Sequence, residues 1–475
     1  MIWARRPNEG AETIQLEAWP TGREGTAVST SVENRYVEGN FAPVTEEVEA
    51  HDLAVTGSIP TELVGRYLRN GPNPIGPVDM RTHHWFVGTG MVHGIRLRDG
   101  RAEWYRNRYV RGDAVAEAQG CEPLPGPRHP FFGGGAPNTN VIGHAGATWA
   151  LVEAGGLPVE MTYDLESVRY IDFDGAWPGA FSAHPKRDPI TGELHVVGYY
   201  WEWDHVKYVV VRPDGTIRKV VEVPVPGKIM LHDCAITDSS VIVFDLPVTF
   251  QLDALSEGYP FPYRWEEGYQ ARVGVLPREG RAEDVRWADV EPCYVYHPLN
   301  AYDLPDGRIV LDVARHPKMF SSDYNGPNEG QPTLDRWTID PAAGKVVEER
   351  LDDRGQEFPR VDERLVGKPH RYGYSAAFGA GVQHGGLLKH DLEAGTSDAH
   401  SFGAGRESGE GVFVPRSDDA SEDDGWVVSL VYDATSDRSD LVILDAQDFA
   451  AEPVATVHLP QRVPFGFHGN WVPDA

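Results

Sequence analysis

The amino-acid sequence predicts an all-β fold, and within that class it favours a β-propeller. Short strand-like segments separated by turns recur along the chain. Residues 208–212 and 216–223, for example, are rich in valine and flank the turn Pro213-Asp214-Gly215. Similar turns precede residues 102–105 and 309–313. Many short hairpins with no break in composition are typical of a propeller and less so of a sandwich or an open sheet.

The composition agrees with a single domain built from strands and tight turns. The chain has 51 glycines and 37 prolines, and a sustained helical periodicity of apolar residues is hard to find. Hydrophobic residues make up 41% of the chain, which is enough for a substantial core. We therefore expect residues 1–475 to form one propeller domain. Residues 1–40 are polar and irregular, and we expect them to form an N-terminal arm on the surface.

The net charge of −29 argues against several classes of function. Such acidity repels the phosphates of nucleic acids and anionic lipid surfaces, so a nucleic-acid-binding role is not expected. No apolar run reaches the roughly 18–20 residues that a membrane-spanning helix needs. The N-terminal Arg5-Arg6 pair has no apolar segment behind it. We therefore expect a cytoplasmic protein.

Motifs for common chemistries are absent from the sequence. It contains no GxSxG, no GxxxxGK[ST] and no HExxH. Residues 88–94 resemble a dinucleotide loop only loosely, with one residue too many before the third glycine. Three cysteines are too few for a disulfide framework, and none forms a CxxC pair: Cys121, Cys234 and Cys293.

Four of the 18 histidines stand in similar surroundings: His184, His232, His297 and His468. Each follows apolar or aromatic residues and precedes a strand or a turn residue. Any one of them alone is more often a surface or core residue than a ligand. Their wide spacing differs from that of a zinc finger. It would suit one ligand from each of several radial units that meet at an axis.

With these motifs in place, the chain resembles the carotenoid cleavage oxygenase family, which includes lignostilbene and other stilbene-cleaving dioxygenases. The resemblance extends from Tyr36 to Trp471. Beside the four histidine segments it rests on residues 65–74 (GRYLRNGPNP), 84–93 (HWFVGTGMVH), 138–140 (NTN), 357–360 (EFPR), 409–415 (GEGVFVP) and 423–433 (DDGWVVSLVYD).

The resemblance implies a seven-bladed β-propeller with a dome of loops and helices over one face. It implies one Fe(II) per chain on the propeller axis, held by His184, His232, His297 and His468. Three glutamates are implied to pair with the last three of these histidines in order: Glu153, Glu357 and Glu410. Thr139 matches the residue whose methyl group crowds one open position on the iron.

The implied reaction is oxidative cleavage of an alkene, in which C=C and O₂ give two carbonyl fragments. The products take up all four oxidising equivalents, so no nicotinamide, flavin or other reductant is needed. This agrees with the missing nucleotide motifs. Neutral imidazoles suit Fe(II). A carboxylate that accepts a hydrogen bond from the other ring nitrogen fixes the tautomer of the imidazole that it contacts. The implied reaction requires no catalytic acid or base.

The expected partners are O₂ and an apolar conjugated alkene, and a carotenoid or apocarotenoid is the favoured substrate. Aromatic residues in three segments, 131–132, 199–203 and 259–265, are candidates for its binding site. A stilbene or phenylpropene substrate is the alternative. That branch of the family holds a phenol with a Tyr and a Lys. Tyr109 matches the Tyr as a candidate substrate contact, but residues 81–170 contain no lysine.

The sequence also leaves two other hypotheses open. One keeps the iron but couples isomerisation to ester cleavage, as an animal visual-cycle branch of the family does. The other is a non-catalytic propeller that serves as an interaction platform.

Val87 and Thr89 stand where the family commonly has acidic residues, which affects assignment to a subfamily. The oligomeric state and transient contact with a membrane are not indicated by the sequence.

Overall fold

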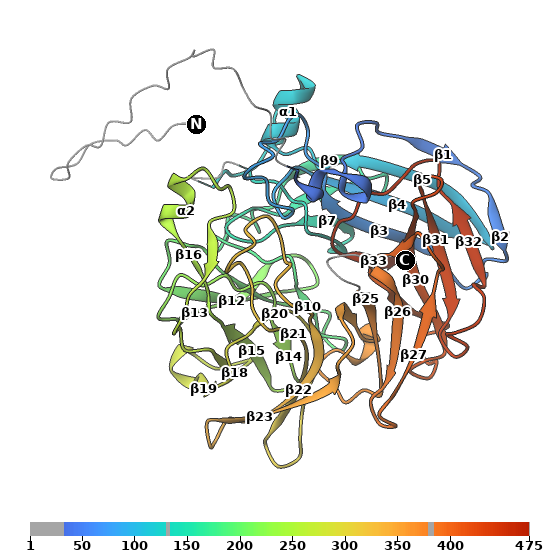
Figure 1. Ribbon diagram of the computed structural model, residues 1–475. Helices are drawn as coiled ribbons and strands as arrows, with labels where there is room; N and C mark the ends of the chain where they lie inside the picture. Colours follow the sequence, from blue (N-terminus) through green and yellow to red (C-terminus); the bar gives the residue numbers. More distant parts are fainter. Residues whose placement is uncertain (1–32, 130–133, 379–383, 475) are drawn as a thin grey trace. The chain divides into compact units, whose positions relative to one another are not determined.

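The computed structural model describes residues 33–129, 134–378 and 384–474. Contacts divide the chain into Met1–Glu33 and Asn34–Ala475. The second unit is a seven-bladed β-propeller, as expected, with seven main antiparallel sheets arranged radially (Figure 1). Residues 131–132, which were candidates for substrate contact, lie outside the described residues, as do residues 1–32 of the predicted arm.

The first three blades are formed by the N-terminal half of the chain together with the last strand. In hydrogen-bonded order the first blade holds β33 (Gly469–Pro473), β3 (Gly65–Pro72), β4 (Gly90–Arg98), β5 (Arg101–Tyr109) and β1 (Glu49–His51). The second holds β6 (Asn140–His144), β7 (Ala147–Leu151), β8 (Val159–Met161) and β9 (Ser167–Tyr170). The third holds β10 (Lys186–Arg187), β11 (Leu194–Gly198), β12 (His205–Val211) and β13 (Ile217–Pro224).

The remaining blades follow in chain order. The fourth holds β14 (Ala235–Ile236), β15 (Ser240–Asp245), β18 (Arg272–Pro277) and β19 (Arg286–Asp289), with a separate hairpin of β16 (Val248–Phe250) and β17 (Tyr263–Trp265). The fifth holds β20 (Tyr294–Asp303), β21 (Ile309–His316), β22 (Thr333–Asp340) and β23 (Lys345–Asp352). The sixth holds β24 (Gln356–Arg360), β25 (Tyr372–Phe378), β26 (His384–Asp391) and β27 (Thr396–Ser401). The seventh holds β28 (Arg406–Ser408), β30 (Gly425–Asp433), β31 (Arg438–Asp445), β32 (Ala455–His458) and β2 (Val55–Gly57), and β29 (Val412–Pro415) also pairs with β30.

Helices are few in the described part of the chain. They are α1 (Asp113–Gln119), α2 (Leu252–Ser256) and the 3-10 turns η1 (Arg35–Val37), η2 (Gly39–Phe41), η3 (Ala282–Asp284) and η4 (Glu363–Leu365). The helices α1 and α2 lie with long loops at one end of the blades, as expected for a dome (Figure 1). None of the helices in the described residues is long and apolar enough to cross a bilayer.

The ring of blades is closed by strands from the two ends of the chain. The C-terminal β33 pairs with β3, from Arg69 opposite Gly469 to Gly65 opposite Pro473. The N-terminal β2 pairs with β32 in the last blade. Pairing of distant segments in two blades ties the first blade to the seventh. The predicted hairpin around Pro213-Asp214-Gly215 is also present, between β12 and β13.

Residues 34–40 differ from the predicted surface arm. The ring of Tyr36 is 3% exposed and stacks on Trp85, with the ring centroids 5.9 Å apart. The Asn34 side chain donates hydrogen bonds to the backbone carbonyls of Met80 and His83. Asn40 is buried as well. The segment packs because its aromatic and amide groups find partners, although the sequence around them is polar.

Candidate metal centre

The four histidines singled out in the sequence come together at the centre of the propeller. His297 lies within β20, and His468 directly precedes β33. His184 and His232 lie shortly before β10 and β14. Each is therefore placed by the first strand of its blade. One ligand atom from each ring lies within 4.8 Å of the others, and all four side chains are buried.

The rings of His232 and His297 point their Nε2 atoms toward each other. Nε2 of His232 lies 3.2 Å from Nε2 of His297. In both rings the Nδ1 side faces a carboxylate, which only accepts hydrogen bonds. When both rings are neutral, the proton is therefore on Nδ1, and two bare lone pairs face each other. A cation between them removes this repulsion. Nε2 of His184 is also buried without a hydrogen-bond partner among the described residues.

Three of the four histidines, His232, His297 and His468, each contact one of the three predicted glutamates. Nδ1 of His232 lies 2.8 Å from Oε1 of Glu153. His297 donates from Nδ1 to Glu357 Oε2 at 2.6 Å, and His468 donates from Nδ1 to Glu410 Oε1 at 3.1 Å. Such contacts fix the orientation and tautomer of a ring that binds a metal.

Each glutamate is held in turn by a second group from a different place in the chain. The Tyr199 hydroxyl donates to Glu153 at 3.1 Å. Nε2 of His316 lies 2.8 Å from Glu357 Oε1. Arg360 donates to Glu410 Oε1 at 3.2 Å. Nothing in the sequence pointed to His316 as part of the site. Tyr199 lies in the predicted aromatic segment 199–203, and Arg360 lies in the motif at residues 357–360, but neither was predicted to contact a glutamate.

His184 has different surroundings from the other three histidines. The nearest carboxylate oxygen, Oδ2 of Asp233, is 4.0 Å from its Nδ1, which is too far for a hydrogen bond. Asp233 instead forms an ion pair with Lys186 at 2.8 Å.

Burial and the glutamates shift the pKa values of the histidines in different directions. Burial takes the pKa of His184 well below its usual value. Burial also lowers the pKa of His297 to about 3, although Glu357 opposes the shift. For His232, burial lowers the pKa, but the nearby carboxylates of Glu153, Asp233 and Glu357 together outweigh burial, so the pKa is raised. Neutral His184 and His297 are ready to donate a lone pair, whereas His232 must release any proton before it binds a metal.

Glu410 predicts a pH dependence of stability in the metal-free protein. Burial raises its pKa, but Arg360 and His468 outweigh burial and bring the value to about 2. A carboxyl group with a lowered folded-state pKa contributes stability above its unfolded pKa, and this is lost as the pH falls through the folded value. We expect the difference in free energy of unfolding between wild type and Glu410→Gln to shrink from pH 4.5 toward pH 2. Urea unfolding across this window measures it, and a constant difference would contradict the assignment.

Thr139 and Tyr109, the two other predicted site residues, lie in different parts of the fold. Thr139 directly precedes β6, and its carbonyl accepts a hydrogen bond from the His468 backbone N–H. Tyr109 ends β5 and packs with Met91 and Val115. Its hydroxyl is bonded to Asn73 at 2.8 Å and to the Val44 carbonyl at 3.2 Å. A substrate contact of Tyr109 therefore stays a prediction.

Aromatic rings lie close to the histidine cluster. The Tyr296 ring lies 5.0 Å from His232, and the Phe358 ring lies 5.3 Å from His297. Phe86 lies 6.4 Å from His232 and also contacts Phe467. Phe261, in one of the predicted aromatic segments, joins this cluster through Phe86. In the predicted aromatic segment 199–203, the Tyr199 hydroxyl donates a hydrogen bond to Glu153.

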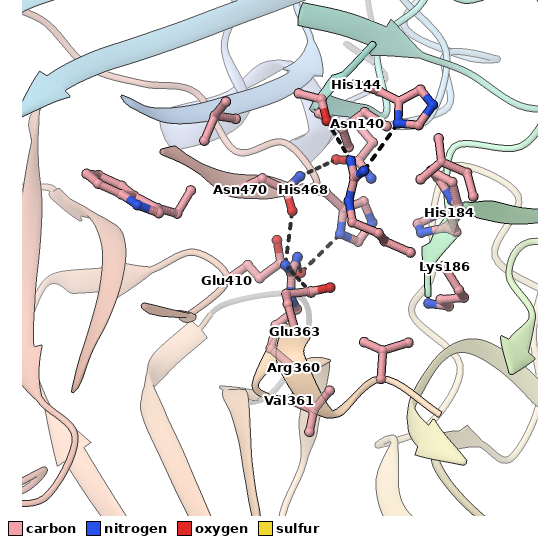
Figure 2. A pocket seen from close by; sticks show the side chains of 18 of the residues that line it. Asn140, His144, His184, Lys186, Arg360, Val361, Glu363, Glu410, His468 and Asn470 are labelled. Atoms are coloured by element: carbon pink, nitrogen blue, oxygen red, sulfur yellow. Dashed lines mark hydrogen bonds and ion pairs between the residues drawn. The ribbon is translucent and has the colours of Figure 1, made fainter. Parts of the chain in front are cut away.

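A polar cavity of about 850 Å³ reaches the histidine cluster, and we call it the axial cavity (Figure 2). Its walls come from β6, β10, β14, β20, β24 and β33, and three of the four histidines line it. Figure 2 shows Lys186, Arg360 and Asn470 on its wall. The cluster thus has an aromatic environment and a polar one.

Sequence comparison identifies relatives over almost the whole chain. A family model described as retinal pigment epithelial membrane protein matches residues 41–473. A carotenoid cleavage oxygenase of Mycobacterium tuberculosis (strain ATCC 25618 / H37Rv) is 47% identical, covering 94% of this chain and 99% of the relative. A carotenoid 9,10(9',10')-cleavage dioxygenase 1 of Arabidopsis thaliana is 32% identical, covering 99% and 95%.

Comparison with solved structures also identifies oxygenases that are similar to this chain. The lignostilbene dioxygenase of Pseudomonas brassicacearum is 30% identical with a TM-score of 0.84, covering 93% of this chain and 99% of that one. Cobalt-substituted apocarotenoid oxygenase of Synechocystis is 30% identical with a TM-score of 0.80, covering 91% and 97%. Together with the four-histidine cluster, these matches identify the chain as a member of the carotenoid cleavage oxygenase family and as a dioxygenase of the carotenoid-cleavage type.

Proposed function

We propose that the chain is a non-heme Fe(II) dioxygenase that cleaves a C=C bond of a carotenoid or apocarotenoid with O₂ into two carbonyl products. The observation that carries the proposal is the cluster of His184, His232, His297 and His468, with their ligand atoms within 4.8 Å of one another. Four imidazole nitrogens suit Fe(II), and these four rings would hold the ion. One ion per chain would occupy the cluster.

The residues around the cluster would hold the metal and shape its surroundings. Glu153, Glu357 and Glu410 keep three imidazoles protonated on Nδ1, so that the Nε2 lone pair is free to bind a metal. The charges of the three carboxylates would also offset that of a dication. When bound, Fe(II) would supply activation of O₂ next to the alkene. Phe86 and Tyr296 would exclude water and hold a conjugated chain against the cluster. None of these roles requires a catalytic acid or base.

A carotenoid or apocarotenoid is supported by the names of the relatives and by the aromatic rings close to the cluster. Both sequence relatives cited above are named for carotenoid cleavage. A stilbene or phenylpropene is the second candidate, because the lignostilbene dioxygenase matches with a TM-score of 0.84. Against it, the hydroxyl of Tyr109 is bonded within the protein, and residues 81–170 contain no lysine.

Thr139 is proposed to crowd one open position on the metal with its methyl group. The proposal is supported by the hydrogen bond that the Thr139 backbone carbonyl accepts from the backbone N–H of His468. We expect Thr139→Ser, which removes only the methyl group, to admit an additional water ligand and to change the visible spectrum of the cobalt-substituted protein. Thr139→Val, which keeps a methyl group, is the control. A Thr139→Ser spectrum identical to that of wild type contradicts this role.

The function is tested by anaerobic loading with Fe(II), followed by O₂ and a panel of apocarotenals, carotenoids, stilbenes and phenylpropenes. We expect one O₂ consumed per alkene cleaved, with aldehyde products identified by mass. Cleavage of stilbenes alone would select the second candidate. Stoichiometric iron with no O₂ uptake on any substrate would overturn the proposal. Isomerisation of a retinyl ester without O₂ would instead support the ester-cleaving branch of the family.

A further inference from the structure

We propose that the axial cavity contains a binding site for a planar oxyanion, an organic carboxylate or bicarbonate, anchored on Arg187. The site is separate from the proposed alkene site, because the aromatic cluster and the axial cavity are distinct environments of the histidine cluster.

The charges that line the cavity leave Arg187 without a carboxylate partner. Four carboxylates line it, and each already forms an ion pair: Asp233 with Lys186, Glu363 and Glu410 with Arg360, and Asp474 with Arg96. Arg187 also lines the cavity, but it forms no ion pair with any of the described residues.

A second unpaired arginine in the wall, Arg66, is accounted for in another way. Its guanidinium stacks on the ring of Tyr163, 3.9 Å from the centroid, and donates to the Tyr163 carbonyl and the Thr148 hydroxyl. An aromatic face partly compensates a buried cation. No aromatic ring covers Arg187 among the described residues, so Arg187 is the better anchor for an anion.

The Arg187 guanidinium is fixed in position before any ligand arrives. Nη2 donates to the Gly143 carbonyl at 2.6 Å, and Nη1 lies 3.2 Å from Nδ1 of His144. Nε2 of His144 faces the Arg212 carbonyl at 2.9 Å, so Nε2 carries the proton and Nδ1 accepts from Arg187. These contacts use only part of the guanidinium fork. A preorganised fork with free N–H donors matches the two oxygens of a carboxylate.

The cavity has the room and the mixed walls that a small organic acid needs. Its volume of about 850 Å³ falls within the range of roughly 300–1,000 Å³ that is typical of ligand sites. Ile142, Ile236 and Val361 supply apolar wall beside the polar groups. Burial also lowers the pKa of Arg187, although Glu363 opposes the shift, as expected for a cation short of negative charge. Because the whole chain is strongly acidic, an anion would bind here only through local contacts.

Titration calorimetry of the metal-free full chain with sodium acetate or sodium bicarbonate tests the site, with sodium chloride holding the ionic strength constant. We expect saturable binding of at least one oxyanion. Arg187→Gln should weaken it by about tenfold or more, since hydrogen bonds to a charged group are lost. Arg187→Lys, which keeps the charge but not the fork, should fall in between. Arg286→Gln is the matched control, because Arg286 is exposed and, within the described part of the chain, donates only to backbone carbonyls.

The outcomes separate this inference from the proposed function. Binding of acetate alone identifies an organic carboxylate, and binding of bicarbonate alone identifies that ion; either supports the site. No saturable binding, or an Arg187→Gln variant that binds as wild type does, overturns it. So does binding that appears only after metal loading, which would place the anion on the metal. Thermal unfolding of Arg187→Gln checks that the variant is folded, and alkene cleavage is not needed for any of these results.

Discussion

His297→Ala is expected to abolish stoichiometric metal binding and to lower alkene cleavage by at least about 1,000-fold. Nε2 of His297 lies 3.2 Å from Nε2 of His232, and its Nδ1 donates to Glu357 at 2.6 Å. The substitution therefore removes a donor nitrogen and one of the two imidazole partners of a buried carboxylate. Metal per chain after anaerobic dialysis against Fe(II), together with O₂ uptake, measures the effect.

A buried histidine away from the cluster provides the matched control. His195 on β11 is 1% exposed, and its Nδ1 lies 2.7 Å from the Tyr208 hydroxyl. His195→Ala removes a comparable buried ring and should keep one metal per chain. If His297→Ala also keeps one metal per chain and wild-type activity, the proposed ligand set is incorrect. His232→Ala should repeat the loss seen with His297→Ala, since the two nitrogens face each other.

The local structure of the blades follows from short-range signals, but the closure of the ring does not. The Pro213-Asp214-Gly215 turn between valine-rich segments was sufficient to predict β12 and β13. The number of blades came only from the family resemblance, because the sequence shows no repeat of fixed period. The pairing of β33 with β3 joins segments about 400 residues apart along the chain. Nothing in either segment alone specifies this partner.

The four histidines stood out because each follows apolar or aromatic residues and precedes a strand or a turn residue, but their assignment as one ligand set came from the family resemblance. The groups that hold the glutamates in place could not be recognised in this way. His316 reaches Glu357 and Arg360 reaches Glu410 across 41 and 50 residues of chain. The aromatic cluster likewise gathers Phe86, Tyr296 and Phe467 from distant segments. Such contacts depend on how neighbouring blades pack, and the pattern of residues within one segment carries little information about them.

Glu357→Ala is expected to weaken Fe(II) binding by about 100-fold, the upper range for loss of a group that orients a metal ligand. Glu357 is 3% exposed and accepts from His297 at 2.6 Å and from His316 at 2.8 Å. Without it, two buried imidazole N–H groups lose their acceptor, and His297 is free to adopt the other tautomer. Competition with a chelator of known affinity measures the change. Glu349→Ala, on the exposed face of β23, is the control and should bind as wild type does.

The geometry also predicts how Glu357 and His316 combine. His316 contacts the cluster through Glu357, so His316→Phe should weaken metal binding by less, about tenfold. Because both substitutions interrupt the same chain of hydrogen bonds, their effects should not add. The double variant Glu357→Ala/His316→Phe should bind Fe(II) about as weakly as Glu357→Ala alone. Additive losses in this cycle would mean that His316 acts on the cluster independently, for example through its contact with the Tyr296 ring at 5.0 Å.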